Sequence, residues 1–326
     1  MTQGIYVITG GASLIGSHIA DQLLAGGARE VRLLDNYSLG TPATIAHLDG
    51  DSRVKRLRGD VMRLPDLLEA TAGADGVFAL AGYLTLPMAQ DPLTGVSVNT
   101  LGMVNTLEAC RFNGVRRLVF SSSVAVYGNA SSHPIGEDTA YVSQGLQPPS
   151  LLYGSSKLMG EALCARYAKA HGIQFNALRF ASVYGERQHA RAVNAVFVAQ
   201  ICDQVRRGQA PVIEGDGSEV HDYVYVTDVA RACVLAMSAE AHGHALNIAT
   251  GVDTTHTRVA ELALKLCGRS DLAIDYREDR RAVRSAAGTR LGFSREQAAR
   301  TIGWEPRIAI EDGMRRLMDW QKGQPA

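Results

Sequence analysis

The sequence has little cysteine, and its five cysteines are an odd number among 326 residues. They lie far apart, mostly within helix-like runs, and no Cys-x-x-Cys pair or His/Cys spacing typical of zinc occurs. They are Cys110, Cys164, Cys202, Cys233 and Cys267. We therefore expect reduced thiols that pack as small apolar side chains, not a disulfide framework. The nine histidines are equally scattered, so we expect no metal site.

Neither sign of charge predominates, because Lys plus Arg and Asp plus Glu each number 33. Without a basic field, the chain is predicted to bind neither nucleic acid nor an anionic membrane. No apolar run approaches the ~18 residues of a membrane span, and the first residues lack a signal-peptide pattern. With 46% hydrophobic residues, these features predict a cytoplasmic globular protein that acts on small molecules.

What the sequence does contain is an alternation of short β-rich runs with longer amphipathic ones. Strands are predicted at 4–10, 30–35, 54–60, 76–82, 116–123 and 173–180. Helices are predicted at 15–27, from near Pro65, at 91–114 and at 158–172. This order is typical of an α/β fold with a Rossmann-type, doubly wound parallel sheet. Its ligand crevice is expected along the carboxyl ends of the strands.

The later part of the chain is less regular, with helices predicted at 192–207, 227–239 and 256–268 between turn-rich segments. We expect a dinucleotide-binding domain at 1–180, with a later contribution from about 225–250. A smaller C-terminal α/β lobe, made of 181–224 and 251–326, is expected to bind the substrate.

A glycine loop, "ITGGASLIG", lies directly between the first predicted strand and the first predicted helix. Gly10 permits the tight turn, Gly16 lets the helix pack on the strand, and helix N-terminal amides can hold a pyrophosphate. The middle glycine of such loops is Ser13 here, and we expect its hydroxyl to donate to the pyrophosphate. Leu14 and Ile15 complete the expected loop contacts.

Asp35 ends the second predicted strand about 20 residues further on, where a carboxylate binds the adenosine ribose hydroxyls. It would repel a 2′-phosphate, and therefore NAD is favoured over NADP. Asn36 is expected beside it, and Asp60 and Val61 suit the adenine edge. The remaining expected cofactor contacts follow the strand at 76–82 and are Leu80, Ala81 and Gly82.

Tyr153 and Lys157 are four residues apart in "LLYGSSKLMGE", which places both on one face of a helix. An isolated pair with this spacing is more often a solvated lysine beside a half-buried tyrosine. A free tyrosine has a pKa near 10, so acid–base work near neutrality needs it lowered by roughly three units, about 4 kcal/mol. A nearby ammonium group would favour the phenolate.

Several motifs occur together in a fixed order: "TGGASLIGSH", "LLDNYS", "VNTLGMVNTLEA", "FSSSVAVYG", "YGSSK", "LRFASVYG" and "DGSEVHDYVYVTDVA". In this order they resemble the extended short-chain dehydrogenase/reductase family, and most of all its NAD-dependent sugar-nucleotide epimerases and dehydratases. The likeness extends through residues 302–320. It implies that Tyr153 is the general base and acid, and that Lys157 binds the nicotinamide ribose and lowers the pKa of Tyr153. Ser123 would bridge Tyr153 and a substrate hydroxyl.

The residues after Ser123 discriminate among the reactions of this family. Dehydratases carry Asp-Glu there, and the related decarboxylases keep the Glu, whereas this chain has Val124 and Ala125. Neither side chain can transfer a proton, so dehydration and decarboxylation are disfavoured. Hydride transfer to NAD remains, either returned to the opposite face as in a UDP-glucose 4-epimerase, or released as in a simple dehydrogenase.

The substrate contacts differ from those of the nucleotide-sugar enzymes. Ser182 stands where these relatives commonly have Asn, and His221 where they have Arg, a stronger phosphate ligand. Arg280, Arg281 or Arg284 could supply the cation instead, and Thr85 in "YLTLP" is expected near the reacting end. A nucleotide sugar is the favoured substrate. A non-nucleotide sugar, sugar acid or other hydroxy compound, oxidised or reduced by a dehydrogenase, is the alternative.

A third possibility is a non-catalytic NAD-sensing protein, although such proteins often lack the tyrosine or lysine that this chain has. The resemblance also implies a homodimer, because relatives pair through helices corresponding to about 93–113 and 152–171. Val98, Leu101, Leu158 and Leu163 are compatible with that interface.

Overall fold

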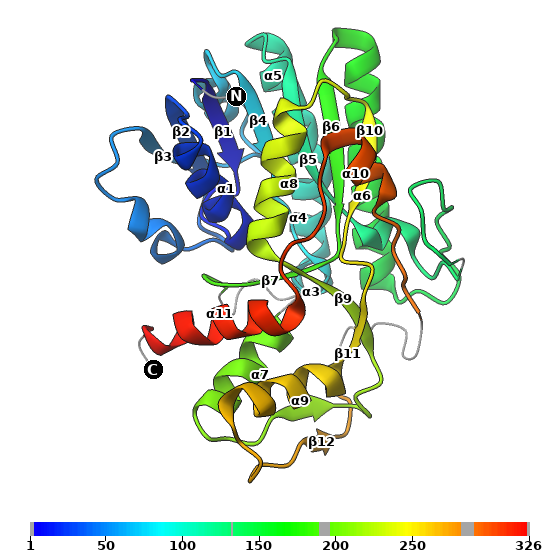
Figure 1. The fold of residues 1–326 in the computed structure, drawn as a ribbon. Coiled ribbons are helices and arrows are strands. Elements are labelled where there is room, and N and C mark those ends of the chain that lie inside the picture. The colour runs from blue at the N-terminus through cyan, green and yellow to red at the C-terminus, as the bar shows by residue number, and fades with distance from the viewer. Residues whose placement is uncertain (1–2, 132, 189–195, 282–289, 325–326) are drawn as a thin grey trace.

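The computed structural model describes residues 3–131, 133–188, 196–281 and 290–324. Its largest element is a seven-stranded parallel sheet in the order β10-β6-β5-β4-β1-β2-β3 (Figure 1). The strands are β1 (Ile5–Thr9), β2 (Glu30–Asp35), β3 (Val54–Arg58), β4 (Gly76–Ala79), β5 (Arg117–Ser123), β6 (Gln174–Phe180) and β10 (His244–Ile248). The six strands predicted from the sequence all form, and β10 joins them at one edge.

Strand pairing brings distant residues to one edge of this sheet. Thr9 at the end of β1 pairs with Leu34 of β2 and with Ala79 of β4. Ser123 at the end of β5 pairs with Phe180 at the end of β6. The strand order reverses between β1 and β4, and in such sheets ligands bind outside the carboxyl ends at that reversal.

Helices cover both faces of the sheet, as the doubly wound prediction requires (Figure 1). One apolar core includes residues of α1 (Leu14–Ala25), α8 (Val226–Ser238) and α10 (Glu296–Ile302). A second core, on the opposite face, includes residues of α2 (Leu64–Thr71), α5 (Met103–Phe112) and α6 (Pro148–His171). Parallel strands buried on both faces are expected to be apolar throughout, which explains runs such as Val7 and Ile8.

The helix predicted at 91–114 is interrupted. It consists of α4 (Pro92–Ser97), a π-helical segment η2 (Val98–Gly102) and α5. In the π segment, Asn99 accepts from the Tyr83 amide at 2.7 Å and donates to the Ser156 hydroxyl at 2.9 Å. Widened turns of this type are frequent at functional sites, because they redirect a side chain without breaking the helix.

The helix that carries Tyr153 and Lys157 begins earlier than the predicted residue 158. α6 starts at Pro148, where a missing amide hydrogen costs nothing, and runs for 24 residues. Gly160 lets this helix lie directly on β5, because a Cβ at residue 160 would be 2.3 Å from the Phe120 ring. Close packing at this point fixes the height of α6 over the sheet.

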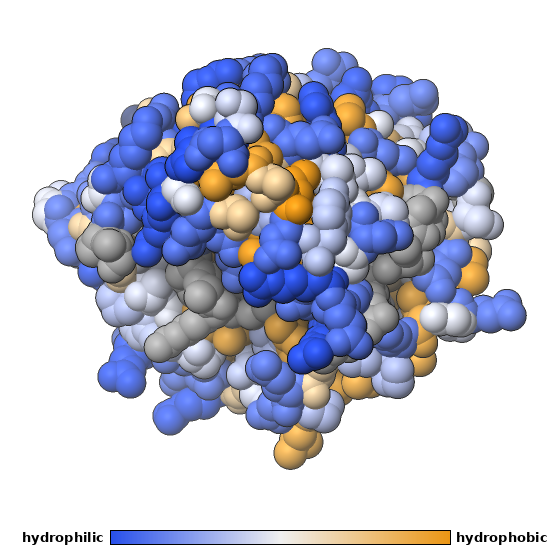
Figure 2. Space-filling model, turned by 90° about the horizontal axis from the view of Figure 1, so that it is seen from below, coloured by the Kyte–Doolittle hydropathy of each residue, from blue (hydrophilic) through white to orange (hydrophobic). Residues whose placement is uncertain are grey.

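A smaller lobe lies below the sheet in Figure 1 and has its own apolar core. It contains a three-stranded sheet of β7 (Ser182–Tyr184), β9 (Val220–Tyr225) and β11 (Asp253–Thr255), and a pair of β8 (Val212–Glu214) and β12 (Asp275–Arg277). Its helices are α7 (Val196–Arg206), α9 (His256–Cys267) and α11 (Ile310–Lys322). The domain boundaries expected from the sequence stay a prediction. Figure 2 views the molecule from this end, where hydrophilic side chains predominate and hydrophobic ones form small groups.

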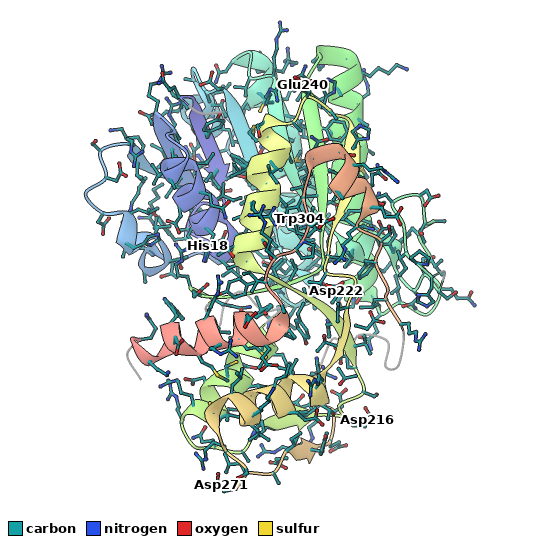
Figure 3. The ribbon with its side chains drawn as sticks, viewed as in Figure 1. His18, Asp216, Asp222, Glu240, Asp271 and Trp304 are labelled. Atoms are coloured by element: carbon teal, nitrogen blue, oxygen red, sulfur yellow. The ribbon has the colours of Figure 1, made fainter. Side chains whose placement is uncertain are left out.

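Two buried carboxylates join the lobe to the rest of the chain. Asp222 of β9 accepts hydrogen bonds from the Thr250 amide and hydroxyl and from the Gly251 amide, at 2.7–2.8 Å. The carboxylate of Asp228 in α8 accepts from the amides of Arg307 and Ile308 at 2.7 and 2.9 Å. The backbone carbonyl of Asp228 accepts from the indole of Trp304 at 2.8 Å, and Figure 3 labels both Asp222 and Trp304. Such buried acceptors are costly unless paired, so these contacts resist separation of the two parts.

Three further short helices complete the described elements: η1 (Pro42–Leu48), α3 (Thr85–Gln90) and η3 (Val124–Tyr127). Among the helices that the described residues form, none is both long and apolar enough to cross a membrane.

The close contact of α6 with β5 can be tested by Gly160→Ala. We expect the free energy of unfolding to fall by about 1–3 kcal/mol from overpacking, more than the gain in helix propensity of about 1 kcal/mol. Thermal unfolding followed by circular dichroism should show a Tm lower by several degrees. Ser155→Ala, at an exposed position on the same helix, should leave the Tm nearly unchanged. An equal Tm for both variants would contradict this packing.

Candidate active site

The loop between β1 and α1 forms a tight cradle at the carboxyl edge of the sheet. Gly10 has φ 68°, a left-handed conformation that favours glycine. A Cβ at Gly16 would lie 2.7 Å from the Gly10 carbonyl oxygen, so any side chain there would push α1 away from the loop. Leu14 and Ile15 begin α1 directly above this turn. The geometry fits a helix N-terminus that receives a pyrophosphate.

Ser13 is accommodated without strain. Its φ of −100° and ψ of 170° are extended, so the position does not require glycine. Its Oγ accepts a hydrogen bond from the Gly16 amide at 3.2 Å and caps α1. This bond uses a lone pair of the oxygen and leaves the hydroxyl proton as a donor. Donation to a pyrophosphate stays a prediction.

Asp35 braces the same loop from the end of β2. Its carboxylate accepts from the Ala12 amide at 2.9 Å and from the Tyr37 amide at 2.8 Å. Asn36 donates to Asp60 at 3.0 Å, so the residues expected around the adenosine lie together. A carboxylate can accept about four hydrogen bonds, and the two hydroxyls of a ribose would donate two.

The remaining predicted cofactor residues line the space between this loop and α6. The amides of Leu80 and Ala81 both donate to Thr9 Oγ1, at 3.1 and 3.2 Å. A Cβ at Gly82 would lie 3.5 Å from Lys157 Nζ, so glycine keeps the approach to the lysine open. Val61 packs beneath η2, where a Cβ at Gly102 would lie 2.7 Å from it. These residues together fit a dinucleotide that extends from Asp35 to Lys157.

Tyr153, Lys157 and Ser123 meet at the edge of the sheet. Lys157 donates to the Ser121 carbonyl at 2.7 Å, and its Nζ lies 5.7 Å from the centre of the Tyr153 ring. Ser123, the last residue of β5, lies close enough to Tyr153 for its hydroxyl to favour the ionised phenol and lower the Tyr153 pKa. Tyr153 and Lys157 are each only 6% exposed. The predicted sharing of one helix face is therefore observed.

The electrostatics of the tyrosine differ from the expectation. Burial raises the pKa of Tyr153 to about 12, and the hydrogen bond with Ser123 only partly offsets this. Burial also lowers the pKa of Lys157 to about 8, partly offset by the negative charge of Glu161. The expected lowering of the Tyr153 pKa by Lys157 is not seen, because the desolvation of the buried phenol is the dominant effect. The oxidised nicotinamide, when bound, supplies the hydride-accepting carbon and an additional positive charge.

Three residues that the sequence reasoning gave no role support this centre. Ser156 donates to the Tyr153 carbonyl at 2.8 Å and receives the hydrogen bond from Asn99. Glu161 lies one helical turn after Lys157 and forms a 2.8 Å ion pair with Arg179. The signals were present in the sequence, since Asn99 lies in the quoted "VNT" run and Glu161 follows Lys157 at helical spacing.

The predicted substrate residues are only partly brought together. Ser182 Oγ lies 3.0 Å from His221 Nδ1, and His221 Nε2 lies 2.7 Å from Glu219 Oε1. Arg281 pairs with Glu219 at 2.7 Å and also with Asp279. Thr85 begins α3 and is partly exposed.

Of the other two candidate arginines, Arg280 does not reach this group. Arg280 is 81% exposed and pairs with Glu278, which places it on the surface instead of in the expected contact. Arg284 lies outside the described residues.

The charge states of the neighbouring groups are set by burial and pairing. Burial would raise the pKa of Glu219, but hydrogen bonds and charges from His221, His256 and Arg281 lower it to about 2. Burial lowers the pKa of His256 to about 4. At neutral pH, Glu219 is therefore ionised and His256 is neutral.

Residues 6–249 match the model of the NAD dependent epimerase/dehydratase family. The chain belongs to this family. Its cofactor is NAD, in agreement with the glycine loop, the carboxylate of Asp35 and the burial of Lys157 opposite Gly82.

Members of the epimerase/dehydratase family resemble this chain over nearly its whole length. A putative UDP-glucose 4-epimerase from Methanocaldococcus jannaschii is 30% identical over 321 residues, 97% of this chain and 98% of that protein. The crystal structure of a Thermotoga maritima UDP-glucose 4-epimerase with UDP-glucose matches with a TM-score of 0.85 and 28% identity, over 98% of both chains. That of a Streptomyces venezuelae dTDP-glucose 4,6-dehydratase with NAD bound also gives 0.85, with 25% identity over 98% of this chain and 97% of the other. These similarities show that the chain is an extended short-chain dehydrogenase/reductase. They do not distinguish between epimerisation and dehydration, because both kinds of enzyme match with the same TM-score of 0.85.

The buried Lys157 predicts a pH-dependent stability. Its pKa is about 8 in the folded protein and about 10.4 in an unfolded chain. Between these values the unfolded chain binds the additional proton, so wild-type stability rises with pH. We expect the unfolding free energy of the wild type to rise between these two pH values by roughly 1–3 kcal/mol more than that of Lys157→Met. Urea titrations of the protein without cofactor, at a series of pH values, measure this difference. Lys169→Met, exposed on the same helix, should follow the wild type. Parallel curves for wild type and Lys157→Met would contradict this.

Proposed function

We propose that this protein is an NAD-dependent nucleotide-sugar epimerase that inverts C4. The observation that carries this proposal is a combination: Tyr153 and Ser123 are present, and the two residues that follow Ser123 are apolar. Val124 and Ala125 open η3 directly after the catalytic strand, and neither can donate or accept a proton. A dehydratase or decarboxylase of the related types needs a carboxyl group there. Tyr153 is then the acid–base group for a hydroxyl whose carbon gives up hydride.

Tyr153, Ser123 and Lys157 have different roles in the proposed reaction. Tyr153, as phenolate, takes the proton from the sugar hydroxyl, while Ser123 hydrogen-bonds to the same oxygen. Lys157 holds the nicotinamide ribose and favours the phenolate. The hydride returns to the opposite face of the 4-keto carbon once the sugar has rotated, and Tyr153 returns the proton to the oxygen, which completes the inverted alcohol. Tyr153 is only 6% exposed, which limits the access of water to this proton transfer.

A second candidate, a dehydrogenase of a non-nucleotide hydroxy compound, is favoured by the charges around His221. Arg281 is the described arginine next to this group, and it is paired with two carboxylates, Glu219 and Asp279. An arginine neutralised in this way is a poor ligand for a diphosphate, which needs an uncompensated, bidentate guanidinium. A substrate without a diphosphate would not require that contact.

Substrate panels separate the two candidates. An epimerase should convert at least one UDP-, GDP- or dTDP-sugar to its C4 epimer, detected by NMR, without net accumulation of NADH at equilibrium. A dehydrogenase should instead form NADH stoichiometrically with a polyol or sugar acid. Absence of conversion across the nucleotide-sugar panel would contradict the epimerase.

Tyr153→Phe should lower kcat by a factor of about 10²–10⁴ while NAD is still bound. Tyr167→Phe is the matched control, because Tyr167 lies on the same helix but bonds to Glu108. NAD binding by fluorescence titration separates a catalytic loss from a folding defect. Unchanged turnover in Tyr153→Phe would exclude the assigned chemistry and favour a non-catalytic NAD-sensing protein.

We further propose a homodimer formed by α5 and α6 with the segments before α5. Exposed apolar side chains gather on these neighbouring elements: Leu93, Leu101, Phe112, Leu151, Leu152 and Met159 are 37–79% exposed. Leu152 and Met159 are seven residues apart and share one face of α6. Of the four residues first expected at this interface, Leu101 is exposed, whereas Val98, Leu158 and Leu163 pack partly against the monomer cores.

Replacement of both Phe112 and Met159 by Glu should convert the dimer to a monomer, since two charges would be desolvated in the four-helix contact. Light scattering coupled to size-exclusion chromatography measures the mass. Val252→Glu, at an apolar residue 58% exposed elsewhere, should leave the mass unchanged. A monomeric wild type at micromolar concentration would contradict the proposal.

We also propose that the enzyme acts in the cytoplasm. Its five cysteines all lie within the described residues and are unpaired, and four of them are buried. Thiols of this kind persist in a reducing compartment.

A further inference from the structure

One cluster in the smaller lobe is made by Glu219, His221 and His256. His256 lies far from the other two in the sequence. Glu219 and His221 are separated by one residue around the start of β9, so their side chains lie on one face. β11 pairs antiparallel with β9, with Thr254 opposite His221, and the His256 amide donates to the Glu219 carbonyl at 3.0 Å. The strand register therefore places the third side chain beside the first two.

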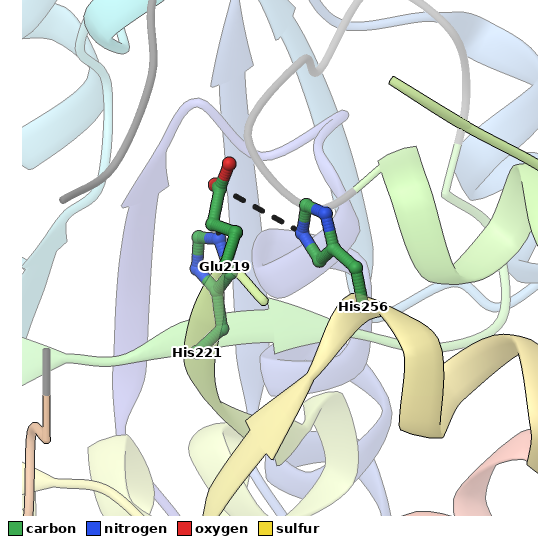
Figure 4. A group of neighbouring side chains, drawn as sticks. All are labelled: Glu219, His221 and His256. Carbon is green, nitrogen blue, oxygen red and sulfur yellow. Dashed lines mark hydrogen bonds and ion pairs between the residues drawn. The ribbon is translucent and has the colours of Figure 1, made fainter. Parts of the chain in front are cut away.

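The potential ligand atoms of this cluster converge on the Glu219 carboxylate (Figure 4). Glu219 Oε1 lies 2.7 Å from His221 Nε2 and 3.9 Å from His256 Nε2. One ligand atom from each residue can be chosen so that all three lie within 4.8 Å of one another. In a tetrahedral site with bonds of about 2.0–2.1 Å, ligand atoms are about 3.3 Å apart. The two separations from Glu219 lie on either side of that value. The third, between the two imidazoles, is at most 4.8 Å, so the histidines would move toward each other by up to about 1.5 Å when an ion binds.

The surrounding contacts orient these side chains as second-sphere groups do at metal sites. The 2.7 Å contact with the Glu219 carboxylate requires a proton on His221 Nε2, and a bound cation would take the place of this proton. The proton on Nδ1 could then be donated to Ser182 Oγ, which lies 3.0 Å away. Arg281 binds Oε2 of Glu219 at 2.7 Å, which leaves Oε1 as the ligand atom. Phe197 stacks on the His256 ring with the ring centres 3.8 Å apart.

The charged side chains beside the two imidazoles are two carboxylates, Glu219 and Asp279, and one guanidinium, Arg281, which binds both of them. A carboxylate oxygen and deprotonated imidazole nitrogens are the atoms through which such residues bind a divalent ion.

We propose that Glu219, His221 and His256 bind a divalent transition-metal ion of the Zn²⁺ type. Two histidines and one glutamate are a ligand set that zinc takes at sites with an open fourth position. The cluster is close to the reacting centre, because Ser182 follows by two residues the Phe180 that pairs with Ser123. The open position would hold an oxygen ligand of the substrate, a role that rests on the proposed function.

Metal binding can be measured directly, without reference to turnover. The untagged full chain, loaded with NAD and stripped with a chelator, is titrated with Zn²⁺ by calorimetry and with Co²⁺ by visible absorption. We expect one ion per chain and Co²⁺ bands of a four- or five-coordinate site. Glu219→Gln and His256→Ala should abolish saturable binding, and Ser182→Ala should weaken it about 10–100-fold.

Glu186→Gln is the matched control, because Glu186 is a partly buried glutamate 3.6 Å from the buried His18, and among the described residues no third ligand joins them. It should bind Zn²⁺ as the wild type does. Circular dichroism checks that each variant is folded. If a variant does not fold, the Co²⁺ spectrum of the wild type alone tests whether the chain has a four- or five-coordinate metal site. Absence of saturable Zn²⁺ and Co²⁺ binding by the wild type would overturn the proposal. Wild-type stoichiometry in Glu219→Gln and His256→Ala would overturn it equally, whereas failure of every sugar panel would leave it standing.

Discussion

The contact on which the site depends is the hydrogen bond from the buried ammonium group of Lys157 to the Ser121 carbonyl. It joins the middle of α6 to the end of β5, and thereby holds Tyr153 over the carboxyl edge of the sheet. A buried ammonium is costly unless it is paired, and here the pairing partner is a backbone carbonyl. This desolvation cost lowers the pKa of Lys157 to about 8, which is close to neutral pH. The site is consequently prepared for a cofactor whose ribose and positive charge complete the environment of the tyrosine.

A second network of buried hydrogen bonds stabilises the same region next to the reacting residues. Arg179 of β6 forms two hydrogen bonds with Glu161 and a third with Tyr127 at 2.9 Å. Ser122 donates to the same glutamate, so α6, β5 and β6 are joined next to the reacting residues. A buried ion pair of this kind adds little net stability, but removal of one partner leaves an uncompensated charge. Its main contribution here is to fix the position and charge of the helix that carries Lys157.

The substrate side is built differently from the cofactor side. The cofactor residues are glycines and backbone amides whose positions follow from strand, turn and helix. Around His221, by contrast, the contacts are made by side chains from β7, from the residue before β9, from α9 and from the segment after β12. Carboxylates and imidazoles at this position are suited to a cation or to hydroxyl groups rather than to a bare diphosphate.

The sequence by itself determined the alternating strands and helices, the glycine turn, Asp35 at the end of β2, and the shared face of Tyr153 and Lys157. These depend on local periodicity and on spacing within one element, which the order of residues specifies directly. Only the tertiary structure decided that Glu219, His221 and His256 meet, that Arg281 is neutralised, that the 91–114 helix contains a π turn, and that burial raises the Tyr153 pKa. Each of these depends on the register between strands or on desolvation by distant elements, and neither quantity is encoded in the spacing of neighbouring residues.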